Sequence, residues 1–171
     1  MVLQRFCPQC GGELEMRFVH GINRRACRKT GCDYVHWDNP VPVVAGLIVH
    51  RNCLLLARNH LWPLGRFSII TGYVEHQEAP ENAVRREVYE ELDLTADSVQ
   101  FVGHYLFKNK NQLIIAYALN THGEPKLGDE IAETRAVPIG DLAHYDFGPF
   151  QITHAIVLDW LRSIRSPTFG E

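Results

Sequence analysis

Apolar runs with the length of buried strands recur through the chain beyond residue 42. Val43 to His50 is almost wholly apolar, and Cys53 to Arg58 follows it across the polar pair Arg51-Asn52. Two such runs around a short polar link predict a pair of neighbouring antiparallel strands. Four more strands are predicted at Phe67 to Ile70, Val99 to Phe107, Gln112 to Leu119 and Glu133 to Ile139, with a polar turn at Lys108 to Asn111.

Two segments show helical spacing of their apolar residues instead. The first of these predicted helices has the apolar stripe Ala83, Val84, Val88 and Leu92. Pro80 suits its first turn. The second is the amphipathic stretch Ile152 to Ile164, preceded by a short turn at Asp141-Leu142. Strands divided between two helices predict an α/β (α+β) sandwich, with a mixed sheet between helices.

The first forty residues carry a different pattern, in which cysteines replace apolar runs. Two residues lie between Cys7 and Cys10, four lie between Cys27 and Cys32, and sixteen separate the two pairs. This arrangement predicts a four-thiolate zinc site, and four protein ligands leave no opening for water, so the zinc is structural. Disulfides and free thiols are the alternatives, but no secretory signal favours disulfides. The segment between the pairs alternates as a short hairpin would.

The remaining cysteine and the segment after the zinc site complete this part of the chain. Cys53 is interpreted as a core residue, because the other four already close the metal site. Tyr34 to Pro42 is aromatic and proline-rich, and it predicts a connector that packs against the next domain. We therefore assign residues 1–37 to a zinc ribbon and residues 38–171 to the main domain.

Composition and charge limit the classes of partner. The chain has 171 residues, 46% of them hydrophobic, which is enough for one domain with a sizeable core plus a small appendage. A net charge of −3 provides no global basic field, so neither a nucleic acid nor a membrane is expected as partner. The first residues lack the apolar core of a signal peptide, and Val43 to Val49 is too short to cross a bilayer. A cytoplasmic location is predicted.

Three acids lie on one face of the first predicted helix. Glu87 precedes Glu90 by three residues and Glu91 by four, which is the spacing of neighbours on one helix face. The three carboxylates therefore converge and repel one another. A hard divalent cation such as Mg²⁺ would relieve that repulsion by taking their oxygens as ligands. A solvated acidic helix face is the alternative interpretation of these three residues alone.

The wider spacing around these acids decides between the two interpretations. Glu78 follows Gly72 after five residues, Arg86-Glu87 follow after seven more, and then come Glu90-Glu91 and Leu94. This pattern resembles the Nudix box. The sequence departs from the family at three positions usually occupied by glycine: Thr71, Gln77 and Asp93. We expect Asp93 to adopt a left-handed conformation at the helix end, which Asp tolerates better than most residues.

The resemblance implies an enzyme that hydrolyses phosphoanhydrides, with Glu87, Glu90 and Glu91 binding Mg²⁺ or Mn²⁺. Glu78 and Arg86 are then an ion pair that supports the box, and Gly72 allows a tight turn. In similar enzymes a glutamate in an "EI" segment reaches the metal or the attacking water. Glu130 occupies that place here, with a solvated loop acid as the alternative.

The ribbon followed by an Asn-Pro pair and an apolar strand resembles a subgroup of Nudix hydrolases that includes NADH, FAD and ADP-ribose pyrophosphatases. The implied substrate is a nucleoside diphosphate linked to another group. The proline- and tryptophan-rich stretch of NADH pyrophosphatases is absent before Gln112. Tyr105 and Phe107 could stack on a base and Lys108 or Lys110 could meet phosphate, or these could be ordinary strand and turn residues.

Two other functions remain as alternatives. A non-catalytic nucleotide sensor with the same fold would usually lack some of the box acids, all of which this chain keeps. An RNA-cap hydrolase would use the ribbon to bind RNA, and its support is the basic cluster Arg24, Arg25, Arg28 and Lys29. A homodimer is expected, because ribbon-bearing relatives commonly pair and the aromatic connector needs a surface to cover.

Overall fold

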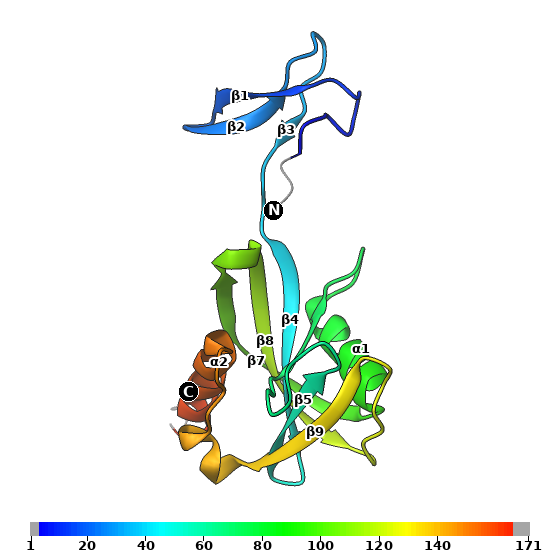
Figure 1. Ribbon diagram of the computed structural model, residues 1–171, viewed down its shortest axis with the longest axis vertical. Helices are drawn as coiled ribbons and strands as arrows, with labels where there is room; N and C mark the ends of the chain where they lie inside the picture. Colours follow the sequence, from blue (N-terminus) through cyan, green and yellow to red (C-terminus); the bar gives the residue numbers. More distant parts are fainter. Residues whose placement is uncertain (1–3, 166–171) are drawn as a thin grey trace, which may run out of the picture. The chain divides into compact units, whose positions relative to one another are not determined.

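The computed structural model describes residues 4–165, which form two compact units divided between Pro40 and Val41. The first unit is an antiparallel sheet of β1 (Leu14–Val19), β2 (Ile22–Cys27) and β3 (Val35–His36) (Figure 1). The predicted hairpin between the cysteine pairs is confirmed as β1 and β2. The connector is partly a strand, because β3 pairs with β2 at Val35 and His36. The assignment of residues 1–37 and 38–171 to separate domains stays a prediction.

The second unit is built on a six-stranded mixed sheet (Figure 1). Its strands are β4 (Val41–His50), β5 (Cys53–Asn59), β6 (Ile70–Tyr73), β7 (Thr95–Phe107), β8 (Gln112–His122) and β9 (Ile131–Pro138). Their order is β7-β8-β4-β5-β9, and β6 pairs with β4. The β4–β8 pair is parallel, and the other pairs are antiparallel. Two 3₁₀ turns, Lys108–Lys110 and Ile139–His144, lie where a polar turn and a short turn were predicted.

Helices α1 (Pro80–Leu92) and α2 (Gln151–Arg165) cover opposite faces of this sheet (Figure 1). Successive residues of β4 point to opposite faces of the sheet. Val43 belongs to the buried cluster that contains α2, and Val44 belongs to the cluster that contains α1. The predicted sandwich with a mixed sheet is confirmed. Within residues 4–165, no helix is both long enough and apolar enough to cross a membrane.

The strand before α1 is displaced from its predicted place. Phe67 to Ile70 was expected to form it, but β6 begins at Ile70, and Ser68 makes only an isolated bridge with Ala57. Gly72 consequently lies inside β6, opposite Val44, so the prediction of a tight turn there is wrong. The end of α1 agrees with the prediction, since Asp93 adopts a left-handed conformation with φ 53°.

Candidate functional site

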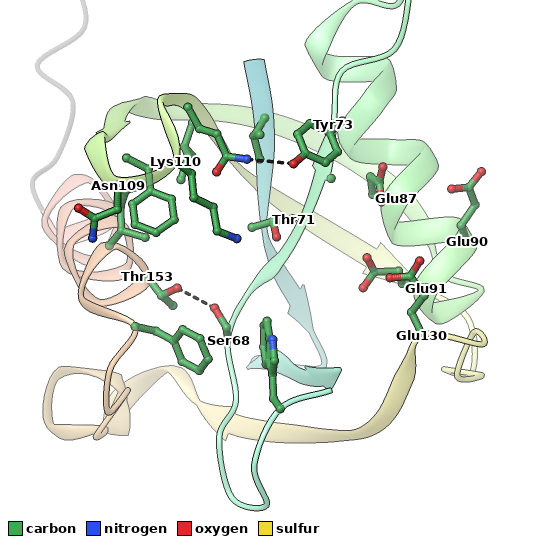
Figure 2. A pocket seen from close by; sticks show the side chains of 18 of the residues that line it. Ser68, Thr71, Tyr73, Glu87, Glu90, Glu91, Asn109, Lys110, Glu130 and Thr153 are labelled. Carbon is green, nitrogen blue, oxygen red and sulfur yellow. Dashed lines mark hydrogen bonds between the residues drawn. The ribbon is translucent and has the colours of Figure 1, made fainter. Parts of the chain in front are cut away.

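A cleft of about 870 Å³ opens in the second unit beside β6, the carboxylate face of α1 and the first turn of α2. Its two ends differ in chemistry (Figure 2). The carboxylates Glu87, Glu90, Glu91 and Glu130 gather at one end, and Asn109, Lys110 and Thr153 lie at the other, with Thr71 between them. The cleft therefore runs from an acidic end to an end with a cation.

The segment between β8 and β9 brings Glu130 to the acids of α1. The N–H of Lys126 donates to Leu92 O and the N–H of Gly128 donates to Glu91 O, both at 2.9 Å. These bonds satisfy carbonyls at the helix end that have no partner within the helix. A Cβ on Gly128 would overlap Glu90 O, so only glycine allows this approach. Gly128 was missed from the sequence, where its only signal was a glycine two residues before Glu130.

Arg86 ties the loop before α1 to the carboxylates on the helix. Its Nε and Nη2 donate to the two oxygens of Glu78 at 2.9 and 3.0 Å, and Nη1 donates to Glu87 Oε1 at 2.7 Å and Glu90 Oε2 at 3.1 Å. Nη2 also donates to Tyr73 O in β6 at 3.1 Å. The planar guanidinium suits such forked contacts. The hydrogen bonds from Arg86, and one from the N–H of Glu75, lower the pKa of Glu78.

Gly72 makes room for one of these carboxylates. A Cβ at this position would overlap the carboxyl group of Glu87, whose side chain is only 15% exposed. Its backbone pairs normally with Val44 of β4, so the need for glycine comes from close approach of a side chain.

Burial and mutual repulsion perturb the acids of the cluster. Burial raises the pKa of Glu91 to about 8, and the charges of Glu87, Glu130 and Glu90 add to the effect. Burial also raises the pKa of Glu87, although contacts with Arg86 oppose the rise. Without a cation, the cluster disfavours carrying its full negative charge.

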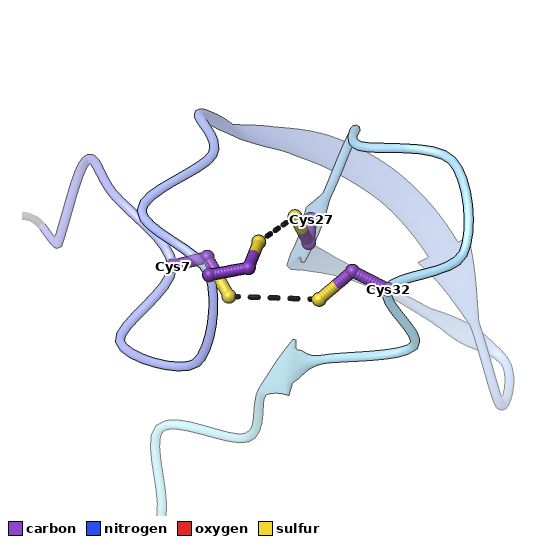
Figure 3. Close-up of side chains that lie close together, drawn as sticks. Cys7, Cys27 and Cys32 are labelled. Carbon is purple, nitrogen blue, oxygen red and sulfur yellow. Dashed lines mark hydrogen bonds between the residues drawn. The ribbon is translucent and has the colours of Figure 1, made fainter.

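The four ribbon cysteines converge in the first unit (Figure 3). Cys7 Sγ and Cys32 Sγ are 3.8 Å apart, Cys10 Sγ and Cys27 Sγ are 3.5 Å apart, and all four sulfurs lie within 4.8 Å of one another. A hydrogen bond from the N–H of Gly12 and another from the Cys27 thiol lower the pKa of Cys10 to about 7. The group is a candidate metal site, and Cys53 lies outside it in β5.

The structure separates the proposed substrate contacts. Phe107 and Lys110 line the cleft, whereas Tyr105 and Lys108 are not among the lining residues. The Tyr105 hydroxyl instead donates to Asp159 of α2 at 3.0 Å, which favours the ordinary strand role for that residue. Trp62 and Phe150, which line the cleft, were missed because each lies in a loop without a local pattern.

The model of the NUDIX domain family matches residues 40–161. The chain belongs to this family. It is 28% identical over 123 residues to the NAD-capped RNA hydrolase NudC of Vibrio vulnificus, which covers 71% of this chain and 46% of that protein. It is 33% identical over 142 residues to the human NAD-capped RNA hydrolase NUDT12, covering 77% of this chain and 30% of that protein.

The chain thus spans less than half the length of these two curated relatives. Among solved structures, that of a NUDIX hydrolase from Nitrosomonas europaea superposes with a TM-score of 0.74 and 23% identity. The match covers 98% of this chain and 94% of that chain, and it shows that the fold is shared.

Nudix proteins generally use a divalent metal ion, and the donors at the acidic end suit one. All of them are carboxylate oxygens, the ligands that hard cations prefer. Within the described residues, the four cysteines are the group whose ligand atoms already lie close enough together to hold a metal ion. Arg86 contacts one oxygen each of Glu87 and Glu90 and leaves the other oxygen of each carboxylate for a metal.

Proposed function

We propose that this Nudix chain hydrolyses the pyrophosphate linkage of a nucleoside diphosphate joined to another moiety, as in FAD, NADH or ADP-ribose. The observation that carries the proposal is the cluster of Glu87, Glu90, Glu91 and Glu130 at one end of a cleft of about 870 Å³. A cleft of this size is at the upper end of the range for small-molecule sites, so it can hold a dinucleotide. The names of the two relatives, both NAD-capped RNA hydrolases, agree with a nucleotide pyrophosphate as the target.

The proposed roles follow from where each side chain lies. Glu87, Glu90 and Glu91 hold Mg²⁺ or Mn²⁺, which when bound polarises phosphate oxygens and acidifies water. Arg86 keeps Glu87 and Glu90 oriented and fixes the loop through Glu78. Either Glu91 or Glu130 accepts the proton of the attacking water, because both line the cleft beside the other acids.

A hydrolysis screen tests the reaction and the substrate together. Purified protein is incubated with Mg²⁺ and NADH, NAD, FAD, ADP-ribose, diadenosine polyphosphates, nucleoside triphosphates or NAD-capped RNA. We expect a nucleoside monophosphate and a phosphorylated remainder from at least one dinucleotide or nucleotide sugar, and no turnover in EDTA. Release of inorganic phosphate alone from every substrate would refute the proposal.

Substitution of the metal ligands tests the site. Glu90→Gln and Glu91→Gln should each lower kcat by roughly a hundredfold or more, since each removes a charged ligand. Glu81→Gln is the matched control on the same helix: Glu81 accepts a hydrogen bond from Tyr117 and does not line the cleft. If both cleft variants retain near wild-type turnover with saturating Mg²⁺, the metal is held elsewhere.

We further propose that the four cysteines of the ribbon hold one structural Zn²⁺. The Cys7–Cys32 distance of 3.8 Å and the Cys10–Cys27 distance of 3.5 Å are close to the sulfur–sulfur edge, about 3.8 Å, of a tetrahedron with Zn–S bonds of about 2.3 Å. All four positions are filled by protein atoms, so this metal would stabilise the ribbon and take no part in hydrolysis.

RNA-cap hydrolysis is the second candidate function, and the names of the two relatives favour it. The basic cluster of the ribbon adds little support, because Arg28 forms an ion pair with Glu13 at 2.8 Å and Arg24 donates to the Val19 carbonyl. NAD-capped RNA in the screen, compared with free NAD at several salt concentrations, separates the two functions. Steep salt dependence for the RNA alone would favour the cap hydrolase.

The remaining expectations concern whether the chain is catalytic, whether it forms a homodimer and where it is located. Retention of all box acids argues against a sensor without catalysis, and the screen decides that point. We keep the proposal of a homodimer in the cytoplasm, which rests on the sequence alone. Light scattering at micromolar concentration should give twice the mass of one chain, and the mass of a single chain would contradict it.

A further inference from the structure

Two aromatic side chains from separate loops meet in the lining of the cleft. Trp62 lies in the loop after β5, and Phe150 directly precedes α2. Their ring centroids are 4.7 Å apart with planes inclined by 41°. Both side chains are half-buried and both line the cleft, so each leaves aromatic surface open to it. Neither residue belongs to the Nudix box.

The two loops are fixed by contacts outside the cleft. The buried Arg58 of β5 donates from Nη1 to Trp62 O at 3.3 Å, and the N–H of Trp62 donates to Asn59 O at 2.9 Å. The side chain of Arg66 lies against Gly148, where a Cβ would overlap it. The aromatic pair is therefore built on two loops that are already held together, which limits the entropy lost when a ligand binds.

A cation lines the same cleft, at its end away from the acids. Lys110 extends into the cleft toward Thr71 (Figure 2). It is the one lysine or arginine among the described residues that line the cleft. Its Nζ lies 5.9 Å from the centroid of the Phe107 ring. One cleft thus holds an aromatic surface, one cation and a carboxylate cluster, which suit the base, a phosphate and a metal-bound phosphate of a nucleotide.

We propose that Trp62 and Phe150 form the binding surface for the base of the nucleoside diphosphate, and that Lys110 binds its 5′ phosphate. This inference rests on the proposed function and adds how the substrate is held: the base lies against Trp62 and Phe150, and the scissile linkage lies at the carboxylates. Stacking tolerates any planar base, because every base has a π-face, so these residues contribute affinity for nucleotides as a class.

Binding of AMP in EDTA tests the aromatic surface without any need for turnover. Calorimetry on the full chain should show that AMP binds more tightly than ribose 5-phosphate, which lacks the base. Trp62→Leu should weaken AMP binding by roughly five- to hundredfold, the range measured for loss of one base–aromatic stack. Trp62→Phe should restore most of the affinity, and Trp37→Leu, at a tryptophan of the first unit, should leave it unchanged.

Lys110→Met tests the phosphate contact, with Lys108→Met as the control at a lysine outside the lining. Lys110→Met should weaken AMP binding and reduce its salt dependence, while adenosine binding stays the same. Equal affinity of AMP and ribose 5-phosphate, no binding of AMP to the wild-type protein, or unchanged AMP binding in Trp62→Leu would each overturn the inference.

Kinetics separate failure of this inference from failure of the proposed function. On the substrate found in the screen, Trp62→Leu should raise KM with little change in kcat. A wild-type enzyme that hydrolyses dinucleotides but whose AMP binding is indifferent to Trp62 refutes only the aromatic subsite. A protein that binds AMP through Trp62 yet hydrolyses nothing refutes only the proposed activity.

Discussion

At the scale of single residues, Gly72 is the position where a methyl group would do most damage to the acidic end of the cleft. Gly72→Ala should displace the Glu87 carboxyl group, because a Cβ there overlaps it. We expect a loss of about 1–3 kcal/mol in stability and a loss of at least about tenfold in kcat. Gly140→Ala is the matched control, since a Cβ at Gly140 meets nothing within 4 Å. Unchanged kcat in Gly72→Ala would contradict the placement of Glu87.

Glu91 predicts a pH dependence of stability in the metal-free protein. Its pKa rises from 4.5 to about 8 on folding, so between these values the folded chain keeps a proton that the unfolded chain has released. The free energy of unfolding in EDTA should therefore fall as pH rises through this window, and saturating Mg²⁺ should oppose the fall. The lowered pKa of Glu78 acts only at more acidic pH.

Urea unfolding at pH 5, 6, 7 and 8 measures this dependence. Glu91→Gln cannot ionise, so its stability should vary less with pH than that of the wild type. Glu81→Gln serves again as the control. Parallel pH profiles for Glu91→Gln and wild type would show that Glu91 does not hold the extra proton.

At the scale of elements, the relation between α1 and the segment before β9 determines whether Glu130 meets the other acids. The contact depends on two backbone hydrogen bonds to the last carbonyls of the helix and on the absence of a side chain at Gly128. Gly128→Ala should therefore destabilise the protein by about 1–3 kcal/mol and lower kcat, because a Cβ would overlap Glu90 O.

Thermal unfolding and kinetics of Gly128→Ala, compared with Gly140→Ala, test this arrangement. Hydrogen exchange offers a direct measurement: the amides of Lys126 and Gly128 should be protected in the wild type and exchange faster in Gly128→Ala. Equal protection in the two proteins would mean that the loop does not depend on glycine at this position.

At the scale of the whole molecule, two compact units with separate candidate metal sites should respond separately to loss of metal. Purified protein should contain about one zinc per chain by elemental analysis. Removal of zinc should unfold the three-stranded sheet of the first unit, because its buried cluster consists chiefly of the cysteines with Leu14. The second unit has two buried clusters of its own and should keep its unfolding transition.

Cysteine variants distinguish the ligands from the remaining thiol. Cys10→Ser should lower zinc content and destabilise the first unit, whereas Cys53→Ser, in β5, should alter neither. A folded, active preparation without zinc would refute the structural role of the metal.

The sequence by itself determined the features that depend on local spacing. Apolar runs separated by polar turns predicted the strands, helical spacing predicted α1 and α2, and the box spacing placed Glu87, Glu90 and Glu91 on one face. These succeed because the periods of strand and helix are properties of the backbone, and they translate directly into which residues share a face.

Only the tertiary structure decided which distant residues meet. The strand before α1 begins later than predicted and includes Gly72. Glycine is therefore needed there because Glu87 approaches closely, and not because the chain turns. The tertiary structure brought Gly128 against the end of α1, and it joined Trp62 to Phe150, which are 88 positions apart in the sequence. Such contacts leave no periodic signal in the sequence, because the packing of the sheet and helices decides which residues of distant segments meet.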